Sequence, residues 1–221
     1  MTKLVMLGDS VFDNSDYLQK GEHDTDAWVR HYLRGEALDI DFLALDGATT
    51  ACVRGHQLGY INPDAEYIVL SIGGNDLLNS FPYLVTNQGS MKQTFSFFEE
   101  MRTTFNNSYG SMINAIRSRA PKAKFMVFDI YYPFWELPEP FSITNLEVHE
   151  KASRVAIDLF NKTIRDRFRD GEVRNLAAIC CEKRHFANQI EPSTVGSQSI
   201  AQKIRDFYEQ SKLPKIPAVP A

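Results

Sequence analysis

Short apolar segments recur along the chain and alternate with longer stretches that have a helical pattern. Each segment is rich in Val, Ile, Leu or Phe, which is typical of strands that are covered on both faces of a parallel sheet. The predicted strands are residues 4–7, 40–45, 67–72, 125–130 and, with the weakest pattern, 173–179.

Between these segments, apolar side chains recur at spacings of three and four residues, which indicates helices with one buried face. The longest such stripe runs from Phe98 to Ile116, and this helix should end before Pro121. Further helices are predicted for residues 26–33, 49–58, 148–164 and 200–207. Strands that alternate with helices predict right-handed crossovers, and therefore an α/β fold: a three-layer α/β/α sandwich around a five-stranded parallel sheet.

The length of 221 residues fits a single domain. We expect this domain to span residues 1–212 and residues 213–221 to form a C-terminal tail. Hydrophobic residues make up 43% of the chain and charged residues 24%, a balance that excludes disordered and collagen-like chains.

Charge and hydropathy narrow the range of partners. The net charge of −4 argues against a nucleic-acid partner, because such binding needs a surplus of Lys and Arg. No apolar run approaches the roughly 20 residues that a membrane span requires. The N-terminus lacks a long apolar region and a small-residue cleavage site, so we expect a cytoplasmic protein. The odd number of cysteines, Cys52, Cys180 and Cys181, predicts reduced and mostly buried thiols rather than disulfides or a zinc site.

Candidate chemistry lies where the first three predicted strands end. Gly8-Asp9-Ser10 follows the first strand, Gly47 follows the second, and Gly73-Gly74-Asn75 follows the third. In a doubly wound sheet, ligands bind outside the carboxyl ends of the strands. A hydroxyl there can attack an ester carbonyl, and the resulting oxyanion needs donors about 3 Å away. The Ser10 and Gly47 N–H groups and the Asn75 side-chain amide are the candidate donors.

These three motifs, with Asp76 after Asn75 and Ala48-Thr49-Thr50 after Gly47, resemble the first three sequence blocks of the SGNH hydrolases, which are also called GDSL lipases or esterases. The resemblance implies a flavodoxin-like sheet, Ser10 as the nucleophile, and Gly47 and Asn75 as partners of the Ser10 amide in the oxyanion hole. It also implies a small-molecule ester as substrate, cleaved through an acyl-enzyme without a cofactor or metal.

The fourth block of that family departs from its pattern here. The family has Asp-x-x-His followed by Pro, in which the histidine is the general base and the aspartate orients it. In this chain Asn188 stands at the aspartate position and Glu191 at the histidine position. Pro192, Gly196 and the pair Ile200-Ala201 keep the block in register.

Three interpretations of this departure remain open. In the first, Glu191 is the base, with a pKa raised by partial burial. In the second, a histidine reaches the serine from elsewhere, with His185 the first candidate and His56 the second. In the third, the site hydrolyses poorly or not at all and binds an acyl or acetylated ligand. A nucleotide or flavin binder is disfavoured, because Gly8-Asp9-Ser10 does not open a G-x-G-x-x-G motif.

Three neighbouring segments could also contribute to the site, and two of them have two interpretations each. The Asp13 carboxylate could orient a base or cap the following turn. The aromatic loop at residues 131–138 could line a pocket for the substrate or form core beneath a long loop. Residues 77–90, which include Phe81 and Tyr83, are a second candidate wall.

Overall fold

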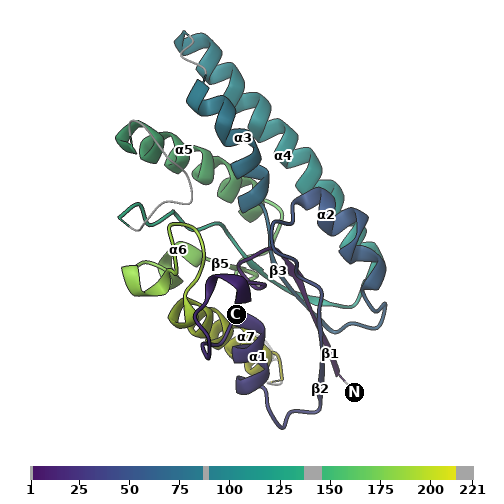
Figure 1. Ribbon diagram of the computed structural model, residues 1–221. Coiled ribbons are helices and arrows are strands. Elements are labelled where there is room, and N and C mark those ends of the chain that lie inside the picture. Colours follow the sequence, from purple (N-terminus) through teal and green to yellow (C-terminus); the bar gives the residue numbers. More distant parts are fainter. Residues whose placement is uncertain (1, 87–89, 137–145, 213–221) are drawn as a thin grey trace, which may run out of the picture.

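A computed structural model describes residues 2–86, 90–136 and 146–212 (Figure 1). Its centre is a sheet of five parallel strands in the order β2-β1-β3-β4-β5. The strands are β1 (Thr2–Gly8), β2 (Leu38–Phe42), β3 (Tyr67–Ser71), β4 (Lys124–Phe128) and β5 (Val173–Arg174). This order is that of flavodoxin-like sheets, so the predicted fold class is confirmed.

Helices cover both faces of the sheet and complete the three layers (Figure 1). On one face lie α2 (Thr50–Gly55), α3 (Gly74–Thr86), α4 (Met91–Arg119) and α5 (Leu146–Arg165). On the other lie α1 (Thr25–Tyr32), α6 (Leu176–Ile179) and α7 (Thr194–Lys212). Short 3-10 turns complete the order: η1 (Ser15–Tyr17), η2 (Gln57–Tyr60) and η3 (Lys183–His185).

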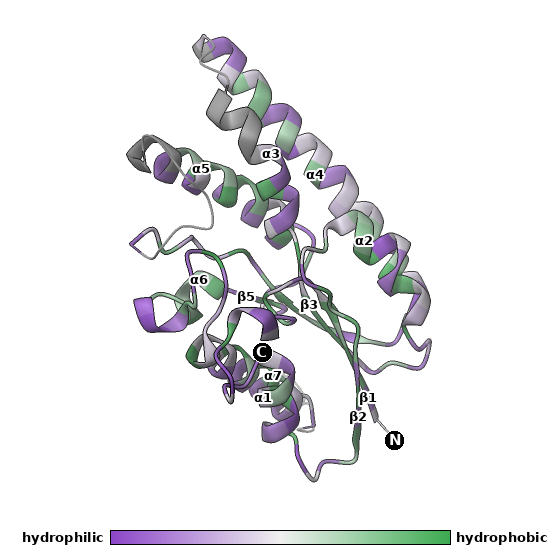
Figure 2. Cartoon of the chain, in the orientation of Figure 1, coloured by the Kyte–Doolittle hydropathy of each residue, from purple (hydrophilic) through white to green (hydrophobic). Residues whose placement is uncertain are grey.

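Each strand supplies side chains to both layers of core. In β1, Val5 and Leu7 pack toward α2 and α4, whereas Leu4 and Met6 pack toward α1 and α7, and all of them are fully buried. Figure 2 shows the result, with hydrophobic strands in the centre and polar residues on the outer faces of the helices. The continuous apolar pattern of the strands therefore reflects burial on both faces.

Local side-chain hydrogen bonds define where several helices begin. The Asp24 carboxylate accepts from the Ala27 N–H at 2.8 Å in front of α1. Ser90 and Gln93 form a capping box in front of α4, which ends at Arg119, before Pro121 as predicted. Within the described ranges, none of the helices combines the length and the apolar character that a membrane crossing requires.

The structure corrects two predictions and leaves one untested. The expected strand at residues 173–179 is wrong beyond Arg174, because the Asn175 side chain accepts from the Ala178 N–H and starts α6 there. The thiols are not mostly buried: Cys180 is, but Cys52 and Cys181 are exposed. Helix α3 was not predicted as a helix. The tail at residues 213–221 lies outside the described residues.

Candidate active site

Ser10 lies where the strand order reverses, at the carboxyl ends of the neighbouring strands β1 and β3. Gly8 makes this approach close: its φ is +145°, and a Cβ atom there would lie 1.9 Å from the Ser71 carbonyl oxygen. The Asp9 N–H then donates to that same oxygen at 3.2 Å. Only glycine fits the strand exit, which brings Ser10 to the ligand-binding edge of the sheet.

Ser10, Asn75 and Glu191 line one cavity, although they come from three distant parts of the sequence. The cavity and its open mouth together hold about 590 Å³ of empty space. Most of its other lining residues are apolar: Val11, Ile72, Leu77, Leu78, Ile130, Pro133, Ile157, Leu176 and Ile190. A hydroxyl, an amide and a carboxyl group thus share a mainly apolar space, which Asp9, Ser71, Asp129 and Tyr131 also line.

The Glu191 side chain lies close enough to Ser10 for the serine to influence its pKa, and it is only 5% exposed. Burial raises the pKa of Glu191 to about 8, although the Ser10 side chain opposes the rise, and the nearby Asp9 and Asp46 carboxylates add to it. Its Oε2 atom is buried and, among the described residues, accepts no hydrogen bond. One oxygen of the carboxyl group is therefore buried without a hydrogen-bond partner among the described residues.

Asn188 does not orient the Glu191 carboxyl group. Its Oδ1 atom accepts from the backbone N–H groups of Ile190 and Glu191, both at 2.9 Å, and so shapes the turn that carries Glu191. A second support, the buried Asn14, was not predicted from the sequence. Its Nδ2 atom donates to the Pro192 carbonyl and to Ser197 Oγ, both at 2.8 Å, which ties the loop after β1 to the start of α7.

The expected oxyanion donors lie in neighbouring loops. Asn75 Nδ2 donates one hydrogen to the Ala48 carbonyl at 3.0 Å, which leaves its second hydrogen for another acceptor. Gly47, next to Ala48, has a φ of +72° but is not among the residues that line the cavity. Within the described chain, the N–H groups of Ser10 and Gly47 donate to no acceptor.

Side-chain contacts on both sides hold the loop that contains Gly47 in place. Asp76, at the start of α3, accepts from the Thr50 N–H at 2.9 Å and from the Thr50 hydroxyl at 2.6 Å. On the other side, the Asp13 carboxylate accepts from the Asp46 N–H at 2.9 Å, so it neither caps its own turn nor contacts a base. Tyr17 donates to Asp46 Oδ2 at 2.8 Å. The Gly47 loop is therefore held by both neighbours.

The candidate histidines lie elsewhere. His185 is buried, its Nδ1 accepts from the Glu182 N–H at 3.1 Å, and burial lowers its pKa. His56 is exposed and packs against Tyr60, with ring centroids 5.4 Å apart. Among the described side chains, no histidine lines the cavity.

The aromatic loop after β4 has both predicted roles. Tyr131 and Pro133 line the cavity, and the Tyr131 hydroxyl donates to the Ile190 carbonyl beside Glu191. Phe134 instead stacks on Phe186 in the core. Residues 137 and 138 of this loop, and the side chains of residues 81–89, lie outside the described part.

The chain was compared with known proteins. The profile of the GDSL-like lipase/acylhydrolase family matches residues 6–188, a range that ends three residues before Glu191. No curated protein sequence matches the chain.

Several solved structures share the fold at low sequence identity. An extracellular lipase from Streptomyces rimosus has a TM-score of 0.68 and 19% identity, over 93% of this chain and 99% of the lipase. A phospholipase A1 from Streptomyces albidoflavus has a TM-score of 0.65 and 19% identity, over 94% and 98% of the two chains. A carbohydrate esterase of family 3 from Talaromyces cellulolyticus has a TM-score of 0.62 and 16% identity, over 96% of this chain and 98% of the esterase. Together with the matched profile, which covers most of the sequence, this shows that the chain belongs to the GDSL-like lipase/acylhydrolase family.

Proposed function

We propose that the protein is a serine ester hydrolase that uses Ser10 as nucleophile and Glu191 as its general base. The observation that carries this proposal is that Ser10 and the buried Glu191 carboxyl group lie next to each other in the lining of one mainly apolar cavity. A general base must lie within hydrogen-bond reach of the proton it removes, and the position of Glu191 beside Ser10 supports that role.

The reaction follows from this arrangement. The ionised Glu191 accepts the Ser10 proton while the oxygen attacks the ester carbonyl carbon, and the carbonyl electrons move to the oxyanion. The N–H groups of Ser10 and Gly47 and the free hydrogen of Asn75 Nδ2 are the proposed donors to that oxyanion. The tetrahedral intermediate then expels the alcohol, which takes the proton from Glu191. Water, deprotonated by Glu191, hydrolyses the acyl-enzyme and restores Ser10.

The raised pKa sets the conditions for this step. With a pKa of about 8, the carboxyl group is largely protonated at neutral pH and cannot accept the serine proton. We therefore expect hydrolysis to be slow at neutral pH and to increase as pH rises through about 8.

The same observation supports a second candidate function, binding of an acyl or acetylated ligand without turnover. A protonated Glu191 would leave the apolar cavity intact and neutral at that position, so an uncharged ester or acyl group could bind without being cleaved. In this case the site would work as a binding pocket at neutral pH and below.

A fluorophosphonate probe separates the two functions, because it reacts covalently with an activated serine. The hydrolase proposal predicts labelling of the wild-type chain at alkaline pH, loss of labelling in Ser10→Ala, and strong reduction in Glu191→Gln. His185→Ala and His56→Ala serve as controls and should label normally once folded. Labelling lost in a histidine variant would assign the base elsewhere, and no labelling at any pH would favour the binding function.

A further inference from the structure

The loop that follows β4 forms part of the cavity wall and leaves the sheet without a neighbouring strand. Strand β5 pairs only with Val127 and Phe128, so the backbone groups of Ile130 have no strand beside them. Buried N–H and C=O groups need partners, and where the sheet ends these must come from side chains or water.

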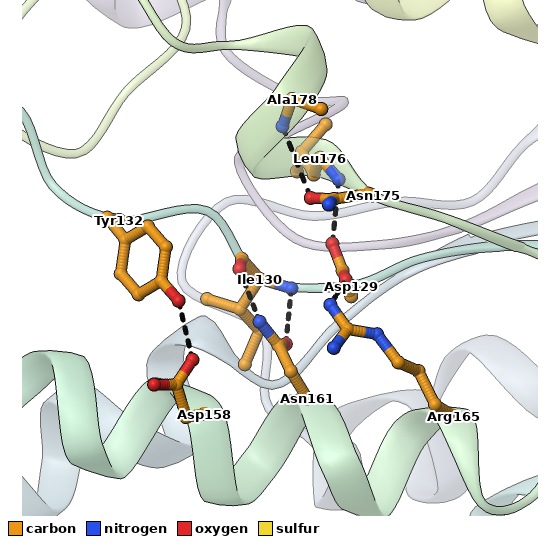
Figure 3. A network of polar contacts seen from close by, with 9 residues as sticks. All are labelled: Asp129, Ile130, Tyr132, Asp158, Asn161, Arg165, Asn175, Leu176 and Ala178. Carbon is orange, nitrogen blue, oxygen red and sulfur yellow. Dashed lines mark hydrogen bonds and ion pairs between the residues drawn. The ribbon is translucent and has the colours of Figure 1, made fainter.

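Asn161 of α5 supplies both partners (Figure 3). Its Oδ1 atom accepts from the Ile130 N–H and its Nδ2 atom donates to the Ile130 carbonyl, both at 2.7 Å. An amide side chain thereby takes the place of a neighbouring strand. Asn161 is only 3% exposed, so water has little access to these two bonds.

The same face of α5 also contacts Asp129, before Ile130, and Tyr132, after it (Figure 3). Asp158, three residues before Asn161, accepts from the Tyr132 hydroxyl, and Arg165, four residues after it, pairs with the buried Asp129. Asp129 in turn accepts from the Leu176 N–H at 2.7 Å, and Leu176 lines the cavity. One helix face therefore fixes the loop from residue 129 to residue 132.

The Ile130 side chain connects this support to the site. It lines the cavity, and its Cδ1 atom lies 3.3 Å from where a Cβ atom on Gly73 would stand. Gly73 lies two residues before Asn75, in the loop that carries that proposed oxyanion donor. If Ile130 moved, the apolar wall of the cavity would change shape, because the Ile130 side chain forms part of that wall.

We infer that Asn161 is a positioning residue that determines acyl-chain selectivity by fixing Ile130 in the wall of the acyl cavity. This inference rests on the proposed function. An acetyl group is too short to use much of the apolar wall, whereas each further methylene of the acyl chain needs an ordered surface to pack against. Loss of the Asn161 bonds should therefore affect long acyl chains more than acetyl.

The test compares p-nitrophenyl acetate and p-nitrophenyl hexanoate in the full chain. We expect Asn161→Leu to lower the hexanoate-to-acetate ratio of kcat/KM by about tenfold or more, through KM for hexanoate, since small misplacements can change rates by up to about 10²-fold. Asn161→Asp, which keeps the acceptor but loses the donor, should have an intermediate effect. Thr163→Val is the matched control: Thr163 is also buried on α5, its hydroxyl bonds among the described residues only to the Leu159 carbonyl, and it does not line the cavity.

If the Asn161 variants do not fold, Ile130→Val can be tested instead, because it removes only the Cδ1 methyl group from the cavity wall. It should lower the same ratio. An unchanged ratio in Ile130→Val and in the folded Asn161 variants would overturn the inference. An equal loss for both esters would also overturn it, because that is the signature of general damage to the fold.

A separate measurement distinguishes this inference from the proposed function. If the wild-type chain neither hydrolyses esters nor reacts with a fluorophosphonate, the proposed function fails. The cavity wall is then tested by the rise in Tm that ethyl hexanoate and ethyl acetate produce. We expect hexanoate to raise the wild-type Tm more than acetate does, and Asn161→Leu to abolish the difference. No difference in the wild-type chain, or one retained in the variant, would overturn the inference.

Discussion

The carboxyl group of Glu191 is buried and, within the described residues, has no cationic partner, so its ionisation is coupled to folding. Its pKa is 4.5 in an ordinary environment and about 8 in the folded chain. Between these values the folded state holds a proton that the unfolded chain has released. Stability from this group is therefore full below the lower pKa and decreases as pH rises toward the higher one. Asp9, with a pKa raised by burial to about 7, contributes with the same sign.

We expect Glu191→Gln to be less sensitive to alkaline pH than the wild-type chain. The neutral amide has no proton to lose, so the free energy of unfolding should fall less across this interval, by on the order of 5 kcal/mol. Denaturant unfolding at several pH values measures this difference. Glu100→Gln, an exposed position on α4, is the control and should follow the wild-type curve. Parallel curves for wild type and Glu191→Gln would contradict the expectation.

Among secondary-structure elements, the start of α2 and the start of α3 act together. Asp76 accepts two hydrogen bonds from Thr50, and burial raises the pKa of Asp76 while these bonds lower it. The lock fixes the distance between the loop that contains Gly47 and the helix turn that contains Asn75. The relative position of two proposed oxyanion donors, Gly47 and Asn75, therefore depends on this side-chain contact between elements.

Thr50→Val tests this lock because it removes the hydroxyl bond and keeps the N–H bond. We expect a loss of about 1 to 3 kcal/mol in stability, since a buried carboxylate oxygen loses its partner. We also expect kcat to fall by about tenfold or more, because an oxyanion donor is misplaced. The pH dependence of kcat should stay unchanged. Thr94→Val, at an exposed position on α4, is the control. A loss of stability with kcat unchanged would separate the lock from the oxyanion hole.

The elements that the sequence predicted well are those whose apolar pattern reflects local burial. Strands β1, β3 and β4 are covered on both faces, so their positions follow from composition alone. The segment after Arg174 failed because Leu176, Ala177, Ala178 and Ile179 fit a strand or a helix equally well. Its outcome depends on the Asn175 cap and on the Asp129 carboxylate, which comes from the loop after β4.

The same distinction applies to the candidate site. Ser10, Gly47 and Asn75 were expected together because strand ends converge at one edge of a parallel sheet, and Glu191 was expected there from the resemblance to the family's fourth block. The structure brings Ser10, Asn75 and Glu191 to one cavity. Asn161 and Arg165 gave no sequence signal, because their roles depend on how one face of α5 meets the loop after β4. The position of Gly47 outside the cavity lining could not be derived from spacing either.

At the scale of the whole molecule, the net charge of −4 is accompanied by a local cluster of acids at the site. Asp9 and Asp46 both raise the pKa of Glu191, and Asp13 holds the Asp46 backbone. Negative charge beside a site attracts cations and repels anions, and salt screens this effect over a Debye length of about 8 to 10 Å. Charge on the alcohol portion of a substrate should therefore influence the rate of association.

We expect kcat/KM for the cationic thioester butyrylthiocholine to decrease with added salt, while kcat/KM for neutral ethyl thiobutyrate stays nearly constant. Asp46→Asn should weaken the salt dependence, because the amide keeps the acceptor for Tyr17 but removes the charge. Asp64→Asn, an exposed residue before the start of β3 and so at the opposite edge of the sheet, should not. Equal salt dependence for the two thioesters would exclude steering by the acidic cluster.

The most direct test of the account is the rate of fluorophosphonate labelling of Ser10 as a function of pH, in the wild-type chain and in Glu191→Gln. We predict that the wild-type rate increases as a single titration with a midpoint near the Glu191 pKa of about 8, and that Glu191→Gln is slow with no such titration. The same titration in both proteins, at similar rates, would contradict the assignment of Glu191 as the base.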